Sequence, residues 1–193
     1  KAGGSSLIYT HWREISIDSY PFDKGERVYG LDFGYNNPTA LIEVINYDDC
    51  FYWRELLYES RLTTSDLIEK LKTFPELANR PIYADSAEPK TIEDIYRAGF
   101  RVEPAYKIVK DGIDLVKRNK LFVCGSSANL LREVKRYSWC KDREGNLLDE
   151  PVKFDDHLLD AGRYAEWHFN GISFGGLSIG NLERESPYAS FRV

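Results

Sequence analysis

The stretch that decides the fold is Arg27 to Asn46, RVYGLDFGYNNPTALIEVIN. Two apolar runs, 27–33 and 39–46, flank a turn in which Gly34 tolerates a positive φ and Pro38 starts the return strand. The pattern predicts two antiparallel strands. Asp32 stands inside the first apolar run, and a buried carboxylate needs a cation, a hydrogen-bond donor or a proton. It is either a functional group or a strand-end aspartate that caps the turn through its side chain.

Residues on both sides of this stretch extend the predicted sheet. Residues 50–58 form an aromatic-rich run after a turn at 46–49, so the chain opens with an antiparallel meander of three strands. Residues 7–22, which include HWREISIDSY, are predicted to form either an edge strand or a linker.

From Thr64 onward the pattern alternates between strands and helices. Thr64 or Ser65 is the expected cap of the first helix, Ser126 or Ser127 of a later one, and Asp155 or Asp156 of the last. A β-hairpin is expected at 137–152. The predicted helices are 64–74, 89–99, 112–118, 126–136 and 157–169, and the further strands are 81–85, 100–104 and 121–124. This order predicts a mixed α/β sheet with helices on both faces and a separate hairpin.

Composition indicates one folded domain in a reducing compartment. The chain has 193 residues with 42% hydrophobic and 14% aromatic residues, and it contains no apolar run long enough to span a bilayer. Its three cysteines form no CxxC pair, which favours a cytoplasmic rather than a secreted protein. Because it has no Met and begins KAGGSS, we expect a domain cut from a longer chain: a lead-in or linker at 1–26, the domain at 27–170 and a tail at 171–193.

Charge is unevenly distributed along the chain. The net charge is −5, yet residues 101–141 contain ten basic and four acidic residues, a local charge of +6. Local rather than net charge governs phosphate binding, so this segment is either a DNA-binding face or a solvated helical surface.

Three carboxylates form the candidate site. Asp32 lies in the first strand, Asp85 ends the strand PIYAD, and Asp160 lies in the last helix, where His157 shares its face at i, i+3. Three carboxylates that converge would repel one another unless cations lie between them. Oxygen ligands suit Mg²⁺ or Mn²⁺, and a pair of such ions supports phosphoryl displacement.

Three segments together resemble a known family. They are GLDFGYNNPTALIEV, IYADSAEPKTIEDI with the GF that follows, and DDHLLDAGRYAEW, and they are similar to the nuclease domain of the large terminase subunit of tailed phages. The resemblance covers about Arg27 to Phe169 and implies a ribonuclease H-like fold, in agreement with the predicted meander. It places Asp32, Asp85 and Asp160 on the metal-binding acids, and His157 where some members carry a histidine that binds metal or lines the site.

The resemblance also implies a function and a setting. It implies two-metal endonucleolytic cutting of concatemeric double-stranded DNA during viral genome packaging, in the cytoplasm of the infected bacterial host. Asp32 would bridge the two ions, while Asp85 and Asp160 would each hold one of them. The implied partners are DNA, the terminase ATPase domain, the small subunit and the portal protein, with no membrane. The chain contains no GxxxxGK[ST] loop, so no ATPase activity is expected of it.

Basic residues between positions 107 and 143 are expected to contact DNA phosphates, and two other functions fit the same sequence. The expected DNA contacts are Lys107, Lys110, Arg132, Lys135, Arg136, Lys141 and Arg143. One rival is another ribonuclease H-like nuclease of the resolvase or transposase type. Another is a non-catalytic module that docks DNA or the portal, although three negative charges facing phosphate disfavour pure binding.

Overall fold

The predicted meander forms the centre of the sheet. The computed structural model describes residues 6–169, so the predicted tail at 171–193 lies outside the described residues. The meander consists of β2 (Glu26–Asp32), β3 (Thr39–Tyr47) and β4 (Cys50–Glu59), paired antiparallel. The hydroxyl of Thr39 donates to the carbonyl of Gly34 at 2.7 Å and closes the turn between β2 and β3. The turn is therefore held by Thr39.

Four further strands join the meander, all in parallel pairs. On one side β5 (Ile82–Ala84) pairs with β2 and β6 (Val102–Pro104) with β5. On the other side β7 (Lys120–Cys124) pairs with β4, and β1 (Arg13–Ile15) lies at the edge beside β7. The sheet order is β1-β7-β4-β3-β2-β5-β6.

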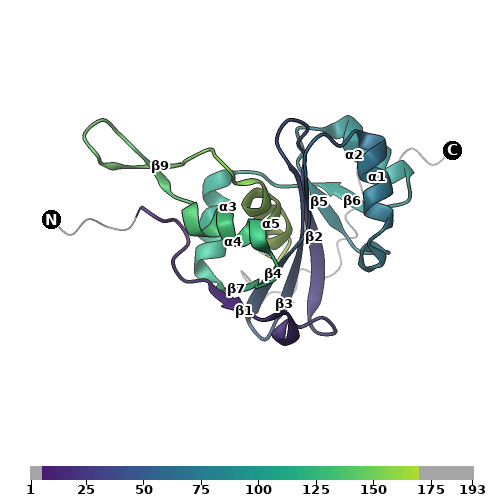
Figure 1. The fold of residues 1–193 in the computed structure, drawn as a ribbon, viewed down its shortest axis with the longest axis horizontal. Helices are drawn as coiled ribbons and strands as arrows, with labels where there is room; N and C mark the ends of the chain where they lie inside the picture. The colour runs from purple at the N-terminus through teal and green to yellow at the C-terminus, as the bar shows by residue number, and fades with distance from the viewer. Residues whose placement is uncertain (1–5, 170–193) are drawn as a thin grey trace, which may run out of the picture.

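Helices cover both faces of this sheet (Figure 1). One face carries α3, α4 and α5, whose apolar residues share a core with Val28, Ile42 and Trp53. The other face carries α1 and α2, which pack on Tyr29 and Leu31. The helices are α1 (Thr64–Lys72), α2 (Pro89–Arg97), α3 (Val109–Arg118), α4 (Ala128–Arg136) and α5 (His157–Trp167), with short 3-10 turns η1 (Ile17–Ser19) and η2 (Pro75–Leu77). The predicted mixed α/β architecture is confirmed. None of the helices in residues 6–169 has the length and apolar character needed to cross a bilayer.

Helix caps differ from the sequence-based expectation. The cap of α1 is Thr63, not Thr64 or Ser65, because Thr63 and Asp66 form a reciprocal capping box. Ser127 stands at the cap position of α4 but its side chain makes no cap bond. Instead the Glu55 carboxylate of β4 accepts from the backbone N–H of Asn129 at 2.9 Å and of Leu130 at 3.1 Å. A distant side chain can satisfy a helix end as well as a local one.

The predicted hairpin consists of β8 (Trp139–Lys141) and β9 (Leu147–Pro151), and it projects from the body of the molecule (Figure 1). At its base Tyr137 is buried, with its ring centroid 5.4 Å from that of Tyr9. The backbone N–H of Ile8 donates to the Tyr137 carbonyl at 2.8 Å. Residues of the lead-in therefore anchor the base of the hairpin.

Two glycines let α5 lie close to the sheet. A Cβ built on Gly30 of β2 would come within 1.8 Å of the carbonyl oxygen of Ala161, and one on Gly162 within 2.4 Å of the Trp53 ring. Real Cβ atoms do not approach other heavy atoms so closely. The helix α5 can therefore lie this close to the sheet only with glycine at positions 30 and 162.

We expect Gly30→Ala to destabilise the domain by at least about 3 kcal/mol, because the added methyl group meets rigid backbone. Urea unfolding measures this. Gly145→Ala is the matched control: it lies in the hairpin turn at φ +86° with nothing within 4 Å, so it costs only backbone strain of about 1 kcal/mol. Equal losses for the two variants would contradict the close approach.

Near its end, α5 buries a carboxyl group in the core. Glu166 is fully buried and accepts from Trp53 Nε1 at 2.9 Å and from Asn119 Nδ2 at 2.6 Å. Burial raises the pKa of Glu166 to about 7, against its ordinary value of 4.5, although the bonds from Asn119 and Trp53 act in the opposite direction. The folded chain therefore holds this proton more tightly than the unfolded chain does.

The contribution of Glu166 to stability should be complete below about pH 4.5 and should fall as the pH rises through about 7. In Glu166→Gln the amide offers a single acceptor oxygen, whereas Trp53 and Asn119 each bond to a different oxygen of Glu166. Leaving one of these donors unpaired lowers the free energy of unfolding by about 1–3 kcal/mol at pH 5. The variant should vary less with pH than the wild type between pH 5 and 8. Urea titrations across that range test this, with exposed Glu144→Gln as control; parallel pH curves for wild type and Glu166→Gln would refute it.

Candidate metal and active site

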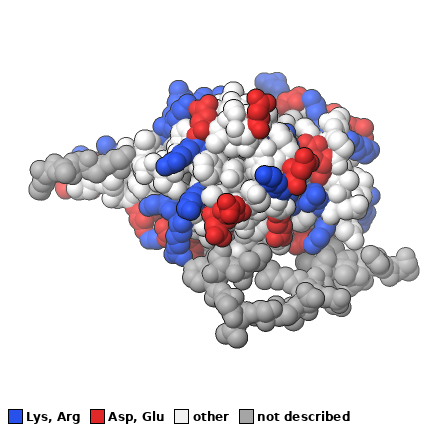
Figure 2. Space-filling view, turned by 90° about the horizontal axis from the view of Figure 1, so that it is seen from below, with Lys and Arg blue, Asp and Glu red and all other residues white. Residues whose placement is uncertain are grey.

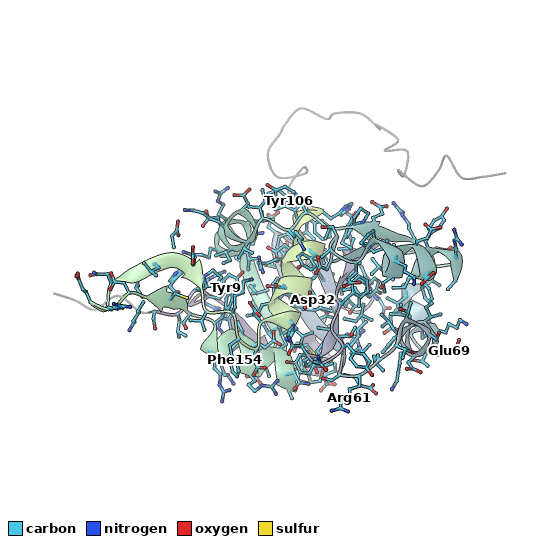
Figure 3. The ribbon with its side chains drawn as sticks, turned by 90° about the horizontal axis from the view of Figure 1, so that it is seen from above. Tyr9, Asp32, Arg61, Glu69, Tyr106 and Phe154 are labelled. Atoms are coloured by element: carbon cyan, nitrogen blue, oxygen red, sulfur yellow. The ribbon has the colours of Figure 1, made fainter. Side chains whose placement is uncertain are left out.

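Two of the predicted acids lie at the carboxyl ends of neighbouring strands of the sheet. Asp32 ends β2 and is 7% exposed, and Asp85 follows β5 directly. These strands are parallel neighbours with Leu31 opposite Ala84, and the Asp85 backbone N–H donates to the Leu31 carbonyl at 3.0 Å. Parallel neighbouring strands bring the two carboxylates to one place. Figure 3, a view from above, labels Asp32 near the middle of the molecule.

The first turn of α5 supplies the third acid and the histidine. The Asp32 Oδ2 atom lies 3.0 Å from His157 Nδ1, so the bond of this carboxylate runs to α5 and the turn-capping alternative finds no support. Asp160, one turn further along, forms an ion pair with Arg163 at i+3. The helix crosses over the sheet edge where β2 and β5 end.

Burial and the charges of Asp160 and Asp85 act together on the Asp32 carboxyl group. Burial raises the pKa of Asp32 to about 6; the hydrogen bond from His157 opposes this shift, while the charges of Asp160 and Asp85 add to it. The buried hydroxyl of Tyr164 has its pKa raised by burial and then by Asp160, Asp32 and Asp85. Asp160 lies three residues after His157 on the helix whose first turn contacts Asp32.

Each acid is held by a cation or a donor of the protein itself. Lys107 Nζ lies 2.7 Å from Asp85 Oδ1, which also accepts from the Ala87 backbone N–H at 2.9 Å. Held in this way, the side chains do not form a ready cluster: within residues 6–169, no three or more His, Cys, Asp and Glu side chains gather as metal ligands. The donor set of carboxylate oxygens nevertheless fits a hard divalent ion, because Asp32 is buried beside two further negative charges.

A buried glutamate that the sequence analysis did not single out positions the start of α5. Asp156 stands at its cap but makes no cap bond; Glu133 Oε2 of α4 accepts from the backbone N–H of Leu158 at 2.8 Å and of Leu159 at 3.1 Å. Burial raises the pKa of Glu133 to about 8. Its place in the apolar stripe Leu130, Val134 is a sequence signal that could have revealed it.

The predicted DNA contacts divide into two groups. Lys107, Lys110 and Arg132 pair with acids, namely Asp85, Asp149 and Asp155. The other four form no ion pair with an acid of residues 6–169 and are exposed to solvent, as Lys107 and Lys110 also are; these four are Lys135, Arg136, Lys141 and Arg143.

A separate basic hollow lies at the opposite edge of the sheet, where β7 begins. Its volume is about 480 Å³ and its lining includes Arg13, Lys117 and Lys120. Figure 2, seen from the side opposite to Figure 3, shows Lys and Arg side chains spread over the whole face, with Asp and Glu side chains among them. The basic segment therefore extends well away from the acids.

Comparison with known proteins identifies what the chain is similar to. No family model matches it. It is 29% identical over 145 residues, 70% of this chain, to the PBSX phage terminase large subunit of Bacillus subtilis (strain 168), and 29% over 150 residues, 72% of this chain, to the large terminase subunit of Escherichia phage T5. The chain spans about a third of the length of these relatives, 33% and 34%.

A solved structure shares the fold. The nuclease domain of the large terminase g2p from bacteriophage SPP1, solved with bound Mn, superimposes with a TM-score of 0.74 and 22% identity, covering 86% of this chain and 99% of that one. The predicted resemblance to terminase nuclease domains and the ribonuclease H-like fold class are confirmed. That Asp32, Asp85, Asp160 and His157 bind metal stays a prediction.

Proposed function

We propose that this chain is a metal-dependent endonuclease domain that cuts double-stranded DNA during viral genome packaging. One observation supports the proposal: Asp32 and Asp85 lie at the carboxyl ends of neighbouring parallel strands, and α5, whose His157 contacts Asp32, carries Asp160 three residues further along. The similarity to terminase large subunits supports it, as does the manganese in the SPP1 domain. Since the chain spans only about a third of the relatives' length, ATPase, small-subunit and portal partners belong to the same proposal, as does the host cytoplasm.

The acids provide the binding groups for the cations. Asp32, Asp85 and Asp160 would hold Mg²⁺ or Mn²⁺, with His157 beside them, and two such ions supply an activated water and charge stabilisation on the leaving oxygen. His157 orients the Asp32 carboxylate through the 3.0 Å bond, and Arg163 orients that of Asp160. Such orientation is the role of groups that surround metal ligands.

The exposed cations provide the binding groups for the DNA backbone. Lys135 and Arg136 at the end of α4, with Lys141 and Arg143 in the hairpin, have side chains open to solvent. Contacts of this kind give affinity that depends on salt rather than on sequence. Lys107 and Lys110 would add to them when a phosphate competes with Asp85 and Asp149.

We expect Asp32→Asn to lower Mn²⁺-dependent linearisation of a supercoiled plasmid by at least about 100-fold, because cation stabilisation of the reacting phosphate is worth several kcal/mol. The wild type should be inactive in EDTA. Asp18→Asn, the same exchange in the exposed turn η1, is the control and should cut normally. Undiminished cutting by Asp32→Asn would exclude Asp32 from the site, and salt-dependent binding without cutting would favour a docking module.

Lys107 should compete with the cation for Asp85, since its ammonium is 2.7 Å from that carboxylate. We expect Lys107→Ala to bind Mn²⁺ a few times more tightly than the wild type in the absence of DNA, a modest gain because Lys107 is half exposed. Isothermal titration calorimetry measures the affinity. Lys110→Ala, which releases Asp149 instead, is the control and should bind Mn²⁺ with the affinity of the wild type. Wild-type Mn²⁺ affinity in Lys107→Ala would show that Lys107 does not compete with the cation.

A further inference from the structure

A second hollow lies near the carboxyl ends of β2 and β5, on the face of the sheet that carries α1 and α2. We call these strand ends, where Asp32 and Asp85 lie, the acid edge. The hollow has a volume of about 500 Å³ and lies between the turn after β2 and the starts of α1 and α2. Phe33, the neighbour of Asp32 in the chain, lines it and packs with the core under α1 and α2. Alternate residues of a strand point to opposite faces, so Asp32 faces α5 while Phe33 faces this hollow.

The hollow is also tied to the second acid. Glu88, which lines it, donates its backbone N–H to the Asp85 carbonyl at 3.3 Å. Both acids that leave the sheet are therefore within a few residues of its wall. The acids and the hollow therefore flank the same strand ends, on opposite faces of the sheet.

The lining has the chemistry of a nucleobase site rather than a phosphate site. Among residues 6–169 no Lys or Arg lines the hollow, and the carboxylate of Glu88 disfavours an anion. Leu62 and Leu67 give apolar walls, while Thr64 and Thr91 offer hydroxyl groups. Carboxylates accept hydrogen bonds from the amino groups of bases.

Tyr35 supplies an aromatic surface at the mouth. It is 58% exposed although it borders the hollow, and its carbonyl accepts from the Arg61 backbone N–H at 2.7 Å. Arg61 is exposed and held at φ 65°, a conformation that non-glycine residues rarely adopt. Figure 3 shows Arg61 at the margin of the face that carries Asp32. An exposed tyrosine at the rim of a hollow is suited to stacking on a base while the adjacent phosphate stays outside.

We propose that this hollow receives one unpaired nucleobase of the DNA strand that lies on the acid edge, stacked on Tyr35. The inference rests on the proposed function and adds a substrate preference to it. A base within a duplex faces its partner and cannot enter, so the domain should prefer DNA that is locally unpaired next to the cut.

Binding to short DNA duplexes in EDTA tests the site without any cutting. One duplex is fully paired, and the other carries two central unpaired nucleotides, one of them the fluorescent base 2-aminopurine. Fluorescence anisotropy gives the affinities, and quenching of 2-aminopurine reports stacking. We expect the wild type to prefer the unpaired duplex about 5- to 100-fold, the range for one base–aromatic stack, and to quench the probe.

Variants of the hollow separate stacking from general loss of tyrosine. Tyr35→Ala should remove both the preference and the quenching, and Tyr35→Phe should keep both. Thr91→Phe, which fills the hollow while Tyr35 remains, should also remove them. Tyr96→Ala, at an exposed tyrosine of α2 outside the lining, should match the wild type.

Equal affinity for the two duplexes, binding of neither, or quenching that survives in Tyr35→Ala would overturn the proposal. These outcomes are independent of plasmid cutting. A wild type that cuts with Mn²⁺ but lacks the preference would refute only the base site. A wild type that quenches the probe but never cuts would refute the nuclease and leave the base site standing.

Discussion

The close seating of α5 on the central sheet is the constraint on which the site depends. Gly30 and Gly162 remove the side chains that would hold the helix away, so Ala161 lies against β2. The first turn of the helix then reaches the end of β2, where His157 contacts Asp32. A helix one methyl group further out would carry Asp160 away from the two strand-end acids, and their shared edge would lose its third member.

Buried charge is the cost of this arrangement, and the chain offsets it locally. Burial is the largest cause of the raised pKa of Asp32, and the charges of Asp160 and Asp85 add to it. His157, Lys107 and Arg163 each hold one of these carboxylates in the structure. Such pairing keeps a like-charged edge folded, and it also explains why the acids do not stand as an open ligand cluster.

The two faces of the sheet carry different chemical groups at the carboxyl ends of β2 and β5. The face under α5 carries the acids with the protein side chains that pair with them. The face under α1 and α2 carries the hollow beside Tyr35. Alternation along β2 makes the division, since Asp32 and Phe33 point to opposite sides. A strand of nucleic acid that crosses the edge would therefore meet charge on one side and an aromatic surface on the other.

The amino-acid sequence alone predicts the meander, the alternating helices and strands, the hairpin and the resemblance carried by the segments around Asp32, Asp85 and Asp160, because periodicity and motif order can be read along the chain. It could not determine contacts between distant segments. Glu55 and Glu133 cap helices from other elements, and Lys107 reaches Asp85, because only packing brings those groups together. The hollow was likewise decided by tertiary structure, since its walls come from three separate parts of the chain.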